Sequence, residues 1–383
     1  MKKDLKVALV APYFPPVVGG IETYVYELSK RLSERDIVVY VFTSGNGTAE
    51  TSDGVEVFRL RALDVKDLPL PLKIPYPIPF SLISKLAEVD ADVIHVHGHI
   101  FFTSLEGAIA SRIARKPLVL TVHDIGVAYQ DSLLVRAMRP FVDSILSGQV
   151  FKSADLVIAQ NNVTCAYASK FSPRKMIVMP PGIDRSKFKP CEDGEGEHVT
   201  FIAARLVPQK GCETFIRSIP AVLEEVGDAE FMIIGDGFQR SRYEKWVKDW
   251  GIQDHVSFVG RISHDDVPMF LAKSKIVVFP SEIPTGLVLL EAAAMKKPII
   301  TTRNAWAQDS LGETPLYIPP NSPGETARAI VRLLREPDER RRIAEQAYRK
   351  VASDGDWDTV VSGHIELYEE LARTGSKEKR GIT

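Results

Sequence analysis

Short apolar runs alternate with longer amphipathic segments along almost the whole chain. Most runs are continuous stretches of Val, Ile and Leu, which is typical of strands that are covered on both faces in a parallel sheet. The first half predicts strands at residues 6–11, 37–43, 55–60, 92–96, 118–122, 155–159 and 176–179, with helices between them, for example at 21–34, 104–115 and 133–152. Strand, helix and strand in this order predict right-handed crossovers and a doubly wound sheet.

The same pattern starts again in the second half. Pro180, Pro181 and Gly182 break the chain, and the polar stretch at 189–198 is expected to be a linker. Strands are then predicted at 199–204, 230–234, 256–259, 276–280 and 298–302, with a short edge strand at 316–318. The chain becomes helical from residue 324 to about 371, and the end from residue 373 is expected to fray. A length of 383 residues suits two domains. The sequence therefore predicts an α/β protein with two Rossmann-like, doubly wound domains.

One segment, residues 68–80 (LPLPLKIPYPIPF), departs from this pattern. Its five prolines exclude regular helix and an interior strand. We expect a loop that packs along the domain surface. The alternative is an apolar lip that meets a lipid or membrane face.

Composition narrows the functional classes. The chain is 45% hydrophobic and 26% charged, as soluble globular proteins are. The formal net charge is −2, so overall charge gives no reason to expect nucleic-acid binding. Cys165, Cys191 and Cys212 lie far apart in sequence, which argues against a zinc site or a disulfide framework and fits a reducing compartment. The first apolar run is too short for a signal peptide, and no stretch is long enough to span a bilayer. We expect a cytoplasmic protein.

Doubly wound sheets bind ligands beyond the carboxyl ends of their strands. In the first half, Gly19 and Gly20 follow the first strand, where glycines permit unusual backbone conformations and close approach to a ligand. The free N–H groups of the next helix favour a phosphate there, although a simple tight turn is the alternative. His97, His123 and Asp124 also lie at strand ends, with His123 directly in the expected crevice.

His95 and His97 are two residues apart, so their side chains point to the same face of the strand. A metal site formed by this pair with His123 and Asp124 is conceivable. No further His or Asp follows at the short spacing such sites need, so we expect no metal and assign these groups to hydrogen bonding in a cleft.

In the second half, Arg205 and Lys210 flank a turn that opens a helix. Two fixed cations at this position would neutralise a diphosphate, whereas surface ion pairing would explain either residue alone. Glu291 lies inside an apolar helix, and a buried carboxylate needs a partner. A ribose diol would supply one.

The motifs together resemble the retaining GT-B glycosyltransferases of the glycogen-synthase-like class (glycosyltransferase family 4 type). The resemblance covers nearly the whole chain and rests on the Gly-Gly turn at 19–20, TVHD at 121–124, PPGID at 180–184, RLVPQKG at 205–211, IIGDG at 233–237, FPS at 279–281 and LVLLEAAA at 287–294. It implies an acceptor-binding domain at 1–185, a nucleotide-sugar domain at 186–356, and a crossover helix at 357–383 that packs on the first domain and ends in a frayed tail.

The resemblance also implies roles for individual residues. His123, Arg205 and Lys210 would be catalytic, with His123 beside the donor sugar and the two cations on the diphosphate. The donor would further contact Gly19, Gly20, Glu282, Thr285, Gly286, Leu287 and Glu291, whereas His97 and Asp124 would line the cleft or meet the acceptor. The Arg–Lys pair would replace a divalent metal.

Two positions depart from the family pattern. The family usually shows two Glu with seven residues between them, but Ile283 lies eight positions before Glu291, and Glu282 is one residue too early. Either Glu282 serves or the first Glu is lost, which leaves the donor sugar open. The loop that begins Arg303-Asn304-Ala305-Trp306 also lacks the Gly-Gly often found there.

We therefore expect a hexose to move with retention from a UDP- or GDP-linked sugar to a hydroxyl acceptor, which is a glycan, a lipid-linked molecule or a small polar one. The leaving diphosphate would take the acceptor proton. No cofactor is expected beyond this co-substrate. An apolar lip at 68–80 would add peripheral contact with the inner membrane face. The alternatives are a nucleotide-sugar epimerase, a phosphorylase, which would need a longer chain, and a catalytically silent sugar-nucleotide-binding protein.

Overall fold

The computed structural model describes residues 5–17, 19–64, 77–125, 143–190, 196–282, 287–353 and 355–380. Contacts divide the chain into two compact units. Unit 1 comprises residues 1–181 and 357–383, and unit 2 comprises residues 182–356. The chain passes from one unit to the other after Pro181 and returns after Asp356.

Unit 1 is built on a mostly parallel sheet in the order β3-β4-β2-β1-β6-β7-β8-β9. β3 pairs antiparallel with β4, and β5 pairs antiparallel with the end of β4. The strands are β1 (Lys6–Val10), β2 (Val38–Gly45), β3 (Thr48–Ser52), β4 (Val55–Asp64), β5 (Pro77–Pro79), β6 (Val93–His97), β7 (Leu118–Val122), β8 (Leu156–Ala159) and β9 (Met176–Val178). The helices are α1 (Gly20–Ser33), α2 (Leu82–Glu88), α3 (Phe102–Ala114), α5 (Gly148–Ser153), α6 (Asn162–Ala168) and α14 (Trp357–Arg380), and a π-helical turn (Asp143–Ser147) precedes α5.

Alternate residues of the unit 1 strands build two separate cores. Val7 and Leu9 pack with side chains of α1 and α14 on one face of the sheet. Ala8 and Val10 pack with α2, α3 and α5 on the other face. Both faces are therefore covered, which explains the continuous apolar runs in the sequence.

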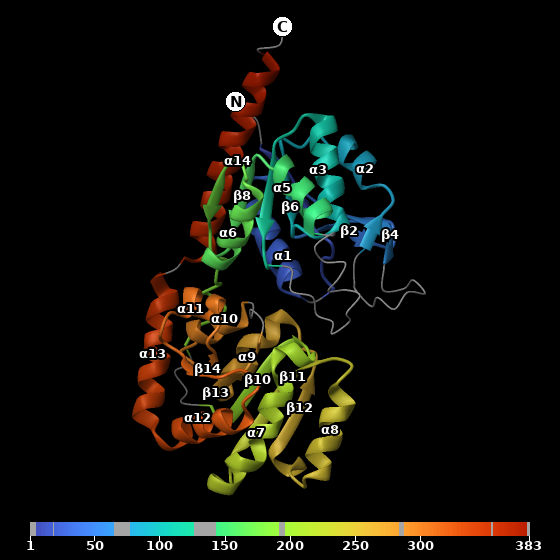
Figure 1. Cartoon of the computed structure of the whole chain (residues 1–383). Coiled ribbons are helices and arrows are strands. Elements are labelled where there is room, and N and C mark those ends of the chain that lie inside the picture. The colour runs from blue at the N-terminus through green and yellow to red at the C-terminus, as the bar shows by residue number, and fades with distance from the viewer. Residues whose placement is uncertain are drawn as a thin grey trace. The chain divides into compact units, whose positions relative to one another are not determined.

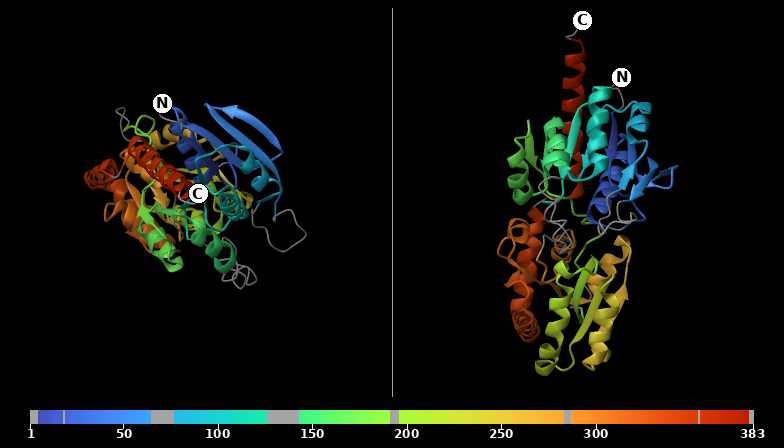
Figure 2. Two further views of the ribbon diagram at one scale, coloured as in Figure 1. Left: turned by 90° about the horizontal axis from the view of Figure 1, so that it is seen from above. Right: turned by 45° about the vertical axis from the view of Figure 1, so that its right-hand side comes forward.

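Helix α14 closes unit 1 from the far end of the chain. Trp357, Val361 and Tyr368 are buried in the same core as α1. Figures 1 and 2 show this helix, in red, lying alongside the strands and helices of unit 1. The helix continues to Arg380, so the prediction that it ends near residue 371 is wrong.

Unit 2 contains a fully parallel sheet in the order β12-β11-β10-β13-β14-β15. Its strands are β10 (His198–Arg205), β11 (Glu230–Asp236), β12 (Val256–Gly260), β13 (Ser274–Phe279), β14 (Ile299–Thr302) and β15 (Leu316–Ile318). Its helices are α7 (Cys212–Glu225), α8 (Arg240–Asp249), α9 (Val267–Ala272), α10 (Val288–Ala294), α11 (Ala305–Leu311), α12 (Pro323–Arg335) and α13 (Pro337–Ser353).

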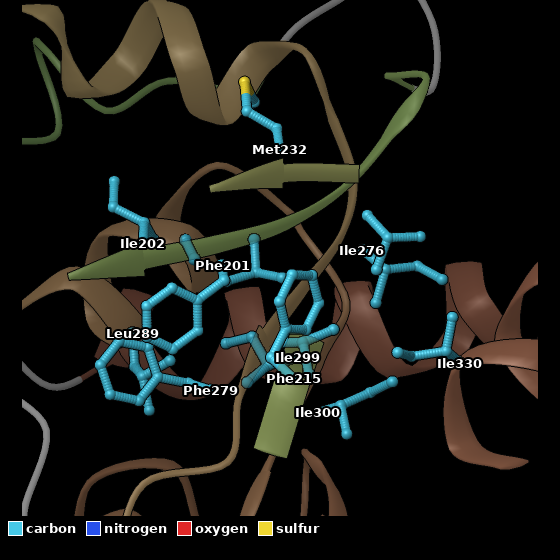
Figure 3. Packing of buried hydrophobic residues seen from close by; sticks show 14 of the residues in the cluster. Phe201, Ile202, Phe215, Met232, Ile276, Phe279, Leu289, Ile299, Ile300 and Ile330 are labelled. Atoms are coloured by element: carbon cyan, nitrogen blue, oxygen red, sulfur yellow. The ribbon is translucent and has the colours of Figure 1, made fainter. Parts of the chain in front are cut away.

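Aromatic rings fill the centre of unit 2. Phe201 of β10 stacks on Phe215 of α7 and Phe279 of β13, with ring centroids 5.7 and 5.5 Å apart. Figure 3 shows these rings among Leu289, Ile299, Ile300 and Ile330. This packing fixes β10 and β13 against each other. Candidate site residues of unit 2 lie at and after the ends of these two strands.

The predicted fold class, two Rossmann-like α/β domains with parallel sheets, is confirmed. The predicted strands all occur, with shifts of at most four residues at their ends, whereas β3 and β5 were not predicted. β5 lies within the proline-rich segment and is a strand at the sheet margin, where proline is tolerated. Residues 68–76 of that segment lie outside the described residues, as does the first half of the helix predicted at 133–152, whose second half is the π-helical turn and α5.

Candidate active site

Each sheet reverses its strand order at one point. In unit 1 the chain moves outward from β1 to β2 and then crosses to β6 on the other side of β1. In unit 2 it moves from β10 through β11 to β12 and then crosses to β13. Connections diverge at such a point, so a crevice opens at the carboxyl ends of the two central strands. The residues that follow β1, β6, β10 and β13 are therefore the candidates for ligand binding.

The Gly-Gly turn after β1 differs from the expectation. Gly19 has an extended backbone (φ −177°, ψ 170°) and caps α1, and Gly20 begins the helix. Neither glycine has the positive φ that would exclude other residues, so the expected glycine-specific backbone is wrong here. A side chain at Gly20 would meet nothing within 4 Å, so the missing side chain leaves open space at the N-terminus of α1.

Two histidines meet at the ends of β6 and β7. The parallel register pairs His97 with Thr121, two residues before His123. His97 Nδ1 lies 3.1 Å from His123 Nε2, so the rings share a hydrogen bond. His97 is fully buried, whereas His123 and Asp124 are partly exposed. His97 is therefore shielded from solvent, and it contacts the partly exposed His123.

A second pair of contacts ties the same strands to α14. His95 Nδ1 lies 2.6 Å from Tyr368 Oη, and His95 Nε2 lies 2.7 Å from Thr121 Oγ1. His364 Nδ1 donates to Val360 O, so its Nε2 is free to accept from Tyr24 Oη at 3.4 Å. The ring of Tyr24, on α1, contacts the His123 ring edge-on, with centroids 5.0 Å apart.

Burial keeps these imidazoles neutral. Desolvation lowers the pKa of His123 to about 4, although the nearby Asp124 carboxylate opposes the shift. It lowers the pKa of His364 to about 4 as well. The pKa values of His95 and His97 lie well below the ordinary histidine value for the same reason, reinforced by neighbouring histidines. Near pH 7 this cluster carries hydrogen-bonding groups without charge.

Sequence analysis missed four groups around this cluster. Tyr24 and Tyr368 lie within predicted helices and were not singled out, and His364 comes from a helix far away in the chain. Gln160 was detectable, because it directly follows the predicted strand β8 at the same edge of the sheet. Its amide nitrogen is buried, and its side chain lies within hydrogen-bonding reach of Tyr24 and His123.

In unit 2, Arg205 ends β10 and Lys210 ends a short 3-10 turn (Pro208–Lys210). Arg205 is exposed and Lys210 is partly exposed. The turn leads through Gly211, which caps α7 with φ +80°. The two predicted cations therefore lie at either end of one short connection at the reversal point of the sheet.

Backbone contacts hold that connection in place. A Cβ atom on Gly211 would overlap the Pro280 carbonyl, and one on Gly235 (φ +130°) would overlap the Ala203 carbonyl. The Gln209 carbonyl accepts from Glu282 N at 3.1 Å and from Ser281 Oγ at 3.0 Å. The turn after β10 thus approaches the residue after β13, and β11 approaches β10, too closely for side chains at these two glycines.

The two glutamates occupy different environments. Glu282 is exposed and its carboxylate accepts from Asn321 Nδ2. Glu291 is 6% exposed, and its Oε1 lies 2.6 Å from His264 Nε2. Lys187 Nζ donates to His264 Nδ1 at 3.2 Å, so His264 donates from Nε2 to Glu291. His264 therefore supplies the partner that burial of Glu291 demands.

The remaining candidates lie near the start of α10. Leu287 precedes this helix and its carbonyl accepts from Glu291 N at 2.9 Å. Thr285 and Gly286 lie outside the described residues.

Neither a cluster of metal ligands nor a membrane-spanning helix is found among the described residues. Among the described residues, no group of three or more His, Cys, Asp and Glu side chains is arranged to hold a metal ion. None of the helices in the described part of the chain is long and apolar enough to cross a membrane.

Comparison with known proteins gives two family matches. Residues 18–187 match the model described as Glycosyltransferase Family 4, and residues 197–336 match Glycosyl transferases group 1. Together the matches span most of the chain and fall on the two units in turn.

Individual relatives cover the chain almost from end to end. The GDP-mannose-dependent alpha-(1-6)-phosphatidylinositol monomannoside mannosyltransferase of Mycobacterium tuberculosis is 26% identical over 93% of this chain and 96% of its own. The GPI3 subunit of phosphatidylinositol N-acetylglucosaminyltransferase from Saccharomyces cerevisiae is 22% identical over 98% of this chain and 85% of its own. Among solved structures, sucrose-phosphate synthase from Thermosynechococcus elongatus superposes with a TM-score of 0.76 at 22% identity, over 97% of this chain and all of the other.

Fold, motifs and family matches agree, and the chain belongs to the family 4 glycosyltransferases, retaining enzymes of GT-B fold that take a sugar from a nucleotide-sugar donor.

Proposed function

We propose that unit 2 binds the nucleoside diphosphate of the donor through Arg205 and Lys210, without a metal ion. The observation that carries this is the position of both cations on one rigid turn at the reversal point of the sheet. Guanidinium and ammonium groups stay charged at all physiological pH values, so they stabilise the negative charge that develops on the leaving diphosphate. The departing phosphate oxygen takes the proton of the acceptor hydroxyl.

We assign the other candidate residues by their positions near the strand ends of their own unit and by the family resemblance. Glu291, oriented by His264, receives the ribose hydroxyls, and Glu282 with the backbone from Thr285 to Leu287 contacts the sugar. In unit 1, His123 lies beside the donor sugar, Gly19 and Gly20 approach the donor, and Asp124 faces the acceptor. Unit 1 is the acceptor-binding domain and unit 2 is the nucleotide-sugar domain in this proposal.

Thermal unfolding with a panel of nucleotides tests the donor site. One nucleoside diphosphate is expected to raise the midpoint, and its nucleotide sugar is expected to do so equally in chelator and in added Mg²⁺. A shift that disappears with chelator would contradict the metal-independent diphosphate site. The panel includes GDP, because one relative is named for a GDP-mannose donor, and UDP, which the sequence predicts as the alternative.

We further propose that the acceptor is lipid-linked and that unit 1 contacts an anionic membrane surface. Two relatives are named for phosphatidylinositol-based substrates, which motivates this choice. On unit 1, α3 exposes Ile109 and Ile113 (65% exposed) together with Arg112 and Arg115. Phe80, which is 73% exposed, directly follows β5, and β5 packs against α3. Exposed apolar groups beside cations suit a surface that offers both acyl chains and phosphates.

Vesicle co-sedimentation tests the membrane contact. Anionic vesicles are expected to bind the full chain, and Ile113→Ser is expected to weaken binding several-fold, since each buried apolar side chain contributes about 1–2 kcal/mol. Val178→Ser is the matched control, because Val178 is 44% exposed on β9 of the same unit and away from α3. Equal binding of both variants and the wild type would contradict the α3 surface.

A further inference from the structure

His97 and His123 form a pair whose protons can be counted. His97 Nδ1 and His123 Nε2 are 3.1 Å apart, which is a hydrogen-bond distance. Such a bond needs one proton between the two nitrogen atoms. The ring of Tyr24 covers both histidines, with centroids 5.9 Å from His97 and 5.0 Å from His123, so the rings are held in fixed orientations.

Neither ring carries a second proton near pH 7. Burial lowers the pKa of His97 well below its ordinary value and that of His123 to about 4. Each ring is therefore a neutral imidazole with one N–H donor and one acceptor nitrogen. Two arrangements remain, one in which His97 donates to His123 and one in which it accepts.

The other nitrogen of His97 decides between these arrangements. His97 Nε2 is buried and has no hydrogen-bond partner in the structure. If His97 accepted at Nδ1, its own proton would lie on Nε2, and a buried N–H donor would have no acceptor. Orphaned buried N–H groups are rare in native proteins, more so than unsatisfied acceptors. The proton of His97 therefore lies on Nδ1, and His123 accepts at Nε2.

We propose that His97 is a positioning residue that fixes His123 in its Nδ1–H tautomer, so that the second ring nitrogen of His123 is a hydrogen-bond donor, which the Gln160 side chain accepts and a ligand oxygen would accept in its place. The step to a ligand rests on the proposed placement of His123 beside the donor sugar. In this form His123 donates to a sugar oxygen and does not remove a proton from the acceptor hydroxyl. That division of labour agrees with proton transfer to the leaving diphosphate.

The groups behind the pair keep the tautomer from changing. His95 stacks on His97 with centroids 4.1 Å apart, but both of its nitrogens are engaged, by Tyr368 and Thr121. His364 donates to the Val360 carbonyl and faces Tyr24 with its other nitrogen. Asp124 is the carboxylate closest in sequence to His123, and its charge favours a proton on that ring.

Nitrogen NMR of the full chain, labelled at histidine, tests the proposal directly. The shifts of the two ring nitrogens distinguish a protonated from an unprotonated position, and the spectra of His97→Asn and His123→Gln assign the two rings. At pH 7 both rings are expected as neutral Nδ1–H tautomers. A proton on Nε2 of either ring, or a doubly protonated ring, would overturn the proposal.

A variant series adds a functional readout. His97→Leu removes the donor, so His123 is expected to show a mixture of tautomers and kcat is expected to fall about tenfold with little change in the KM for the donor. His97→Asn places an amide near the position of Nδ1 and is expected to restore most of the rate. Thr121→Val perturbs His95 and is expected to leave the His123 tautomer unchanged.

The outcomes separate this inference from the proposed site. If His123→Gln retains wild-type kcat and KM, His123 does not contact the reacting groups, whatever its tautomer. If NMR shows His97 protonated on Nε2, the positioning role fails even where His123→Gln is inactive.

Discussion

Both sheets reverse their strand order at one point, but the residues near that point are neutral histidines in unit 1 and cations in unit 2. In unit 1 the strand ends beside the reversal carry His95 and His97, which are fully buried and neutral. In unit 2 the corresponding ends carry Arg205 and Lys210, which reach solvent. A diphosphate needs fixed positive charge, whereas the reacting sugar needs oriented groups that do not compete for its protons. This difference in charge matches the proposed division of roles, in which unit 2 binds the diphosphate and unit 1 orients the reacting sugar.

The sites are also held by different means. In unit 1, side-chain hydrogen bonds from His95, Tyr368 and Thr121 join strand ends to the last helix of the chain. In unit 2, close backbone packing at Gly211 and Gly235 holds the chain next to Arg205 and Lys210, and the Ser281 hydroxyl bonds to the Gln209 carbonyl. Unit 1 should therefore respond to pH and to loss of single polar atoms, and unit 2 to loss of charge and to added side-chain volume.

The largest expected effect is on the charge in unit 2. Lys210→Ala removes one of two cations at the leaving group, so kcat should fall by about 10²–10³-fold. Initial rates at saturating donor measure this. Lys245→Ala is the control, because Lys245 lies exposed on α8 in an ion pair with Asp249 and should change kcat less than about twofold. Similar rates for both variants would remove the diphosphate role.

The next effect is the acid sensitivity of unit 1. The pKa of His364 is about 4 in the folded chain and about 6.5 when unfolded. Between these values the unfolded chain binds more protons, so the free energy of unfolding falls as pH drops from 6.5 to 4. His364 alone accounts for about 3 kcal/mol of this loss. The other buried histidines add to it, whereas Glu106, whose pKa is raised to about 7, opposes it between pH 7 and 4.5.

Hydrogen exchange, corrected for the intrinsic pH dependence of exchange, measures the acid effect unit by unit. Amides of β6, β7 and α14 should lose protection between pH 6.5 and 4, while those of β10 and β13 keep it. His364→Gln should reduce the loss, and His255→Gln in unit 2, at a partly exposed histidine, should not. Equal loss in both sheets would contradict the difference between the units.

The sequence predicted most of the strands because hydrophobic runs report burial on both faces directly. β7 and β15 have their predicted bounds, and Arg205 and Lys210 lie at the strand end and turn expected of them. β3 was missed because its residues are all exposed, so it has no apolar pattern. The local pattern of apolar residues thus identifies the strands whose side chains are buried in the core.

The histidine network could not be predicted in the same way. His364 and Tyr368 reach His95 only after α14 packs on a sheet nearly 300 residues earlier in the chain, and Tyr24 reaches His97 only after α1 packs on the same sheet. The Glu291–His264 contact likewise joins helix α10 to the 3-10 turn that follows β12. Such pairs depend on tertiary packing, and no spacing in the sequence encodes them.

A smaller effect concerns the backbone in unit 2. Gly211→Ala adds a Cβ both at a positive φ and against the Pro280 carbonyl, so the free energy of unfolding should fall by about 2 kcal/mol or more. Gly251→Ala is the matched control, because Gly251 has φ +68° but open space around the added atom, and should cost about 1 kcal/mol. Denaturant midpoints compare the two. Donor affinity should fall only for Gly211→Ala, since that change moves Lys210.

The smallest effect tests the polar contacts of unit 1. Tyr368→Phe removes the hydroxyl 2.6 Å from His95 Nδ1 and leaves a buried nitrogen without a partner, which should cost about 1 kcal/mol of stability. Tyr26→Phe is the control, because its hydroxyl donates to Asp53 at 3.0 Å on the exposed surface and should be nearly neutral. Nucleotide diphosphate affinity should stay unchanged in both, because that site lies in unit 2. A loss of nucleotide affinity in Tyr368→Phe alone would mean that the two sites are coupled, and the separation of charge in one unit from orientation in the other would no longer hold.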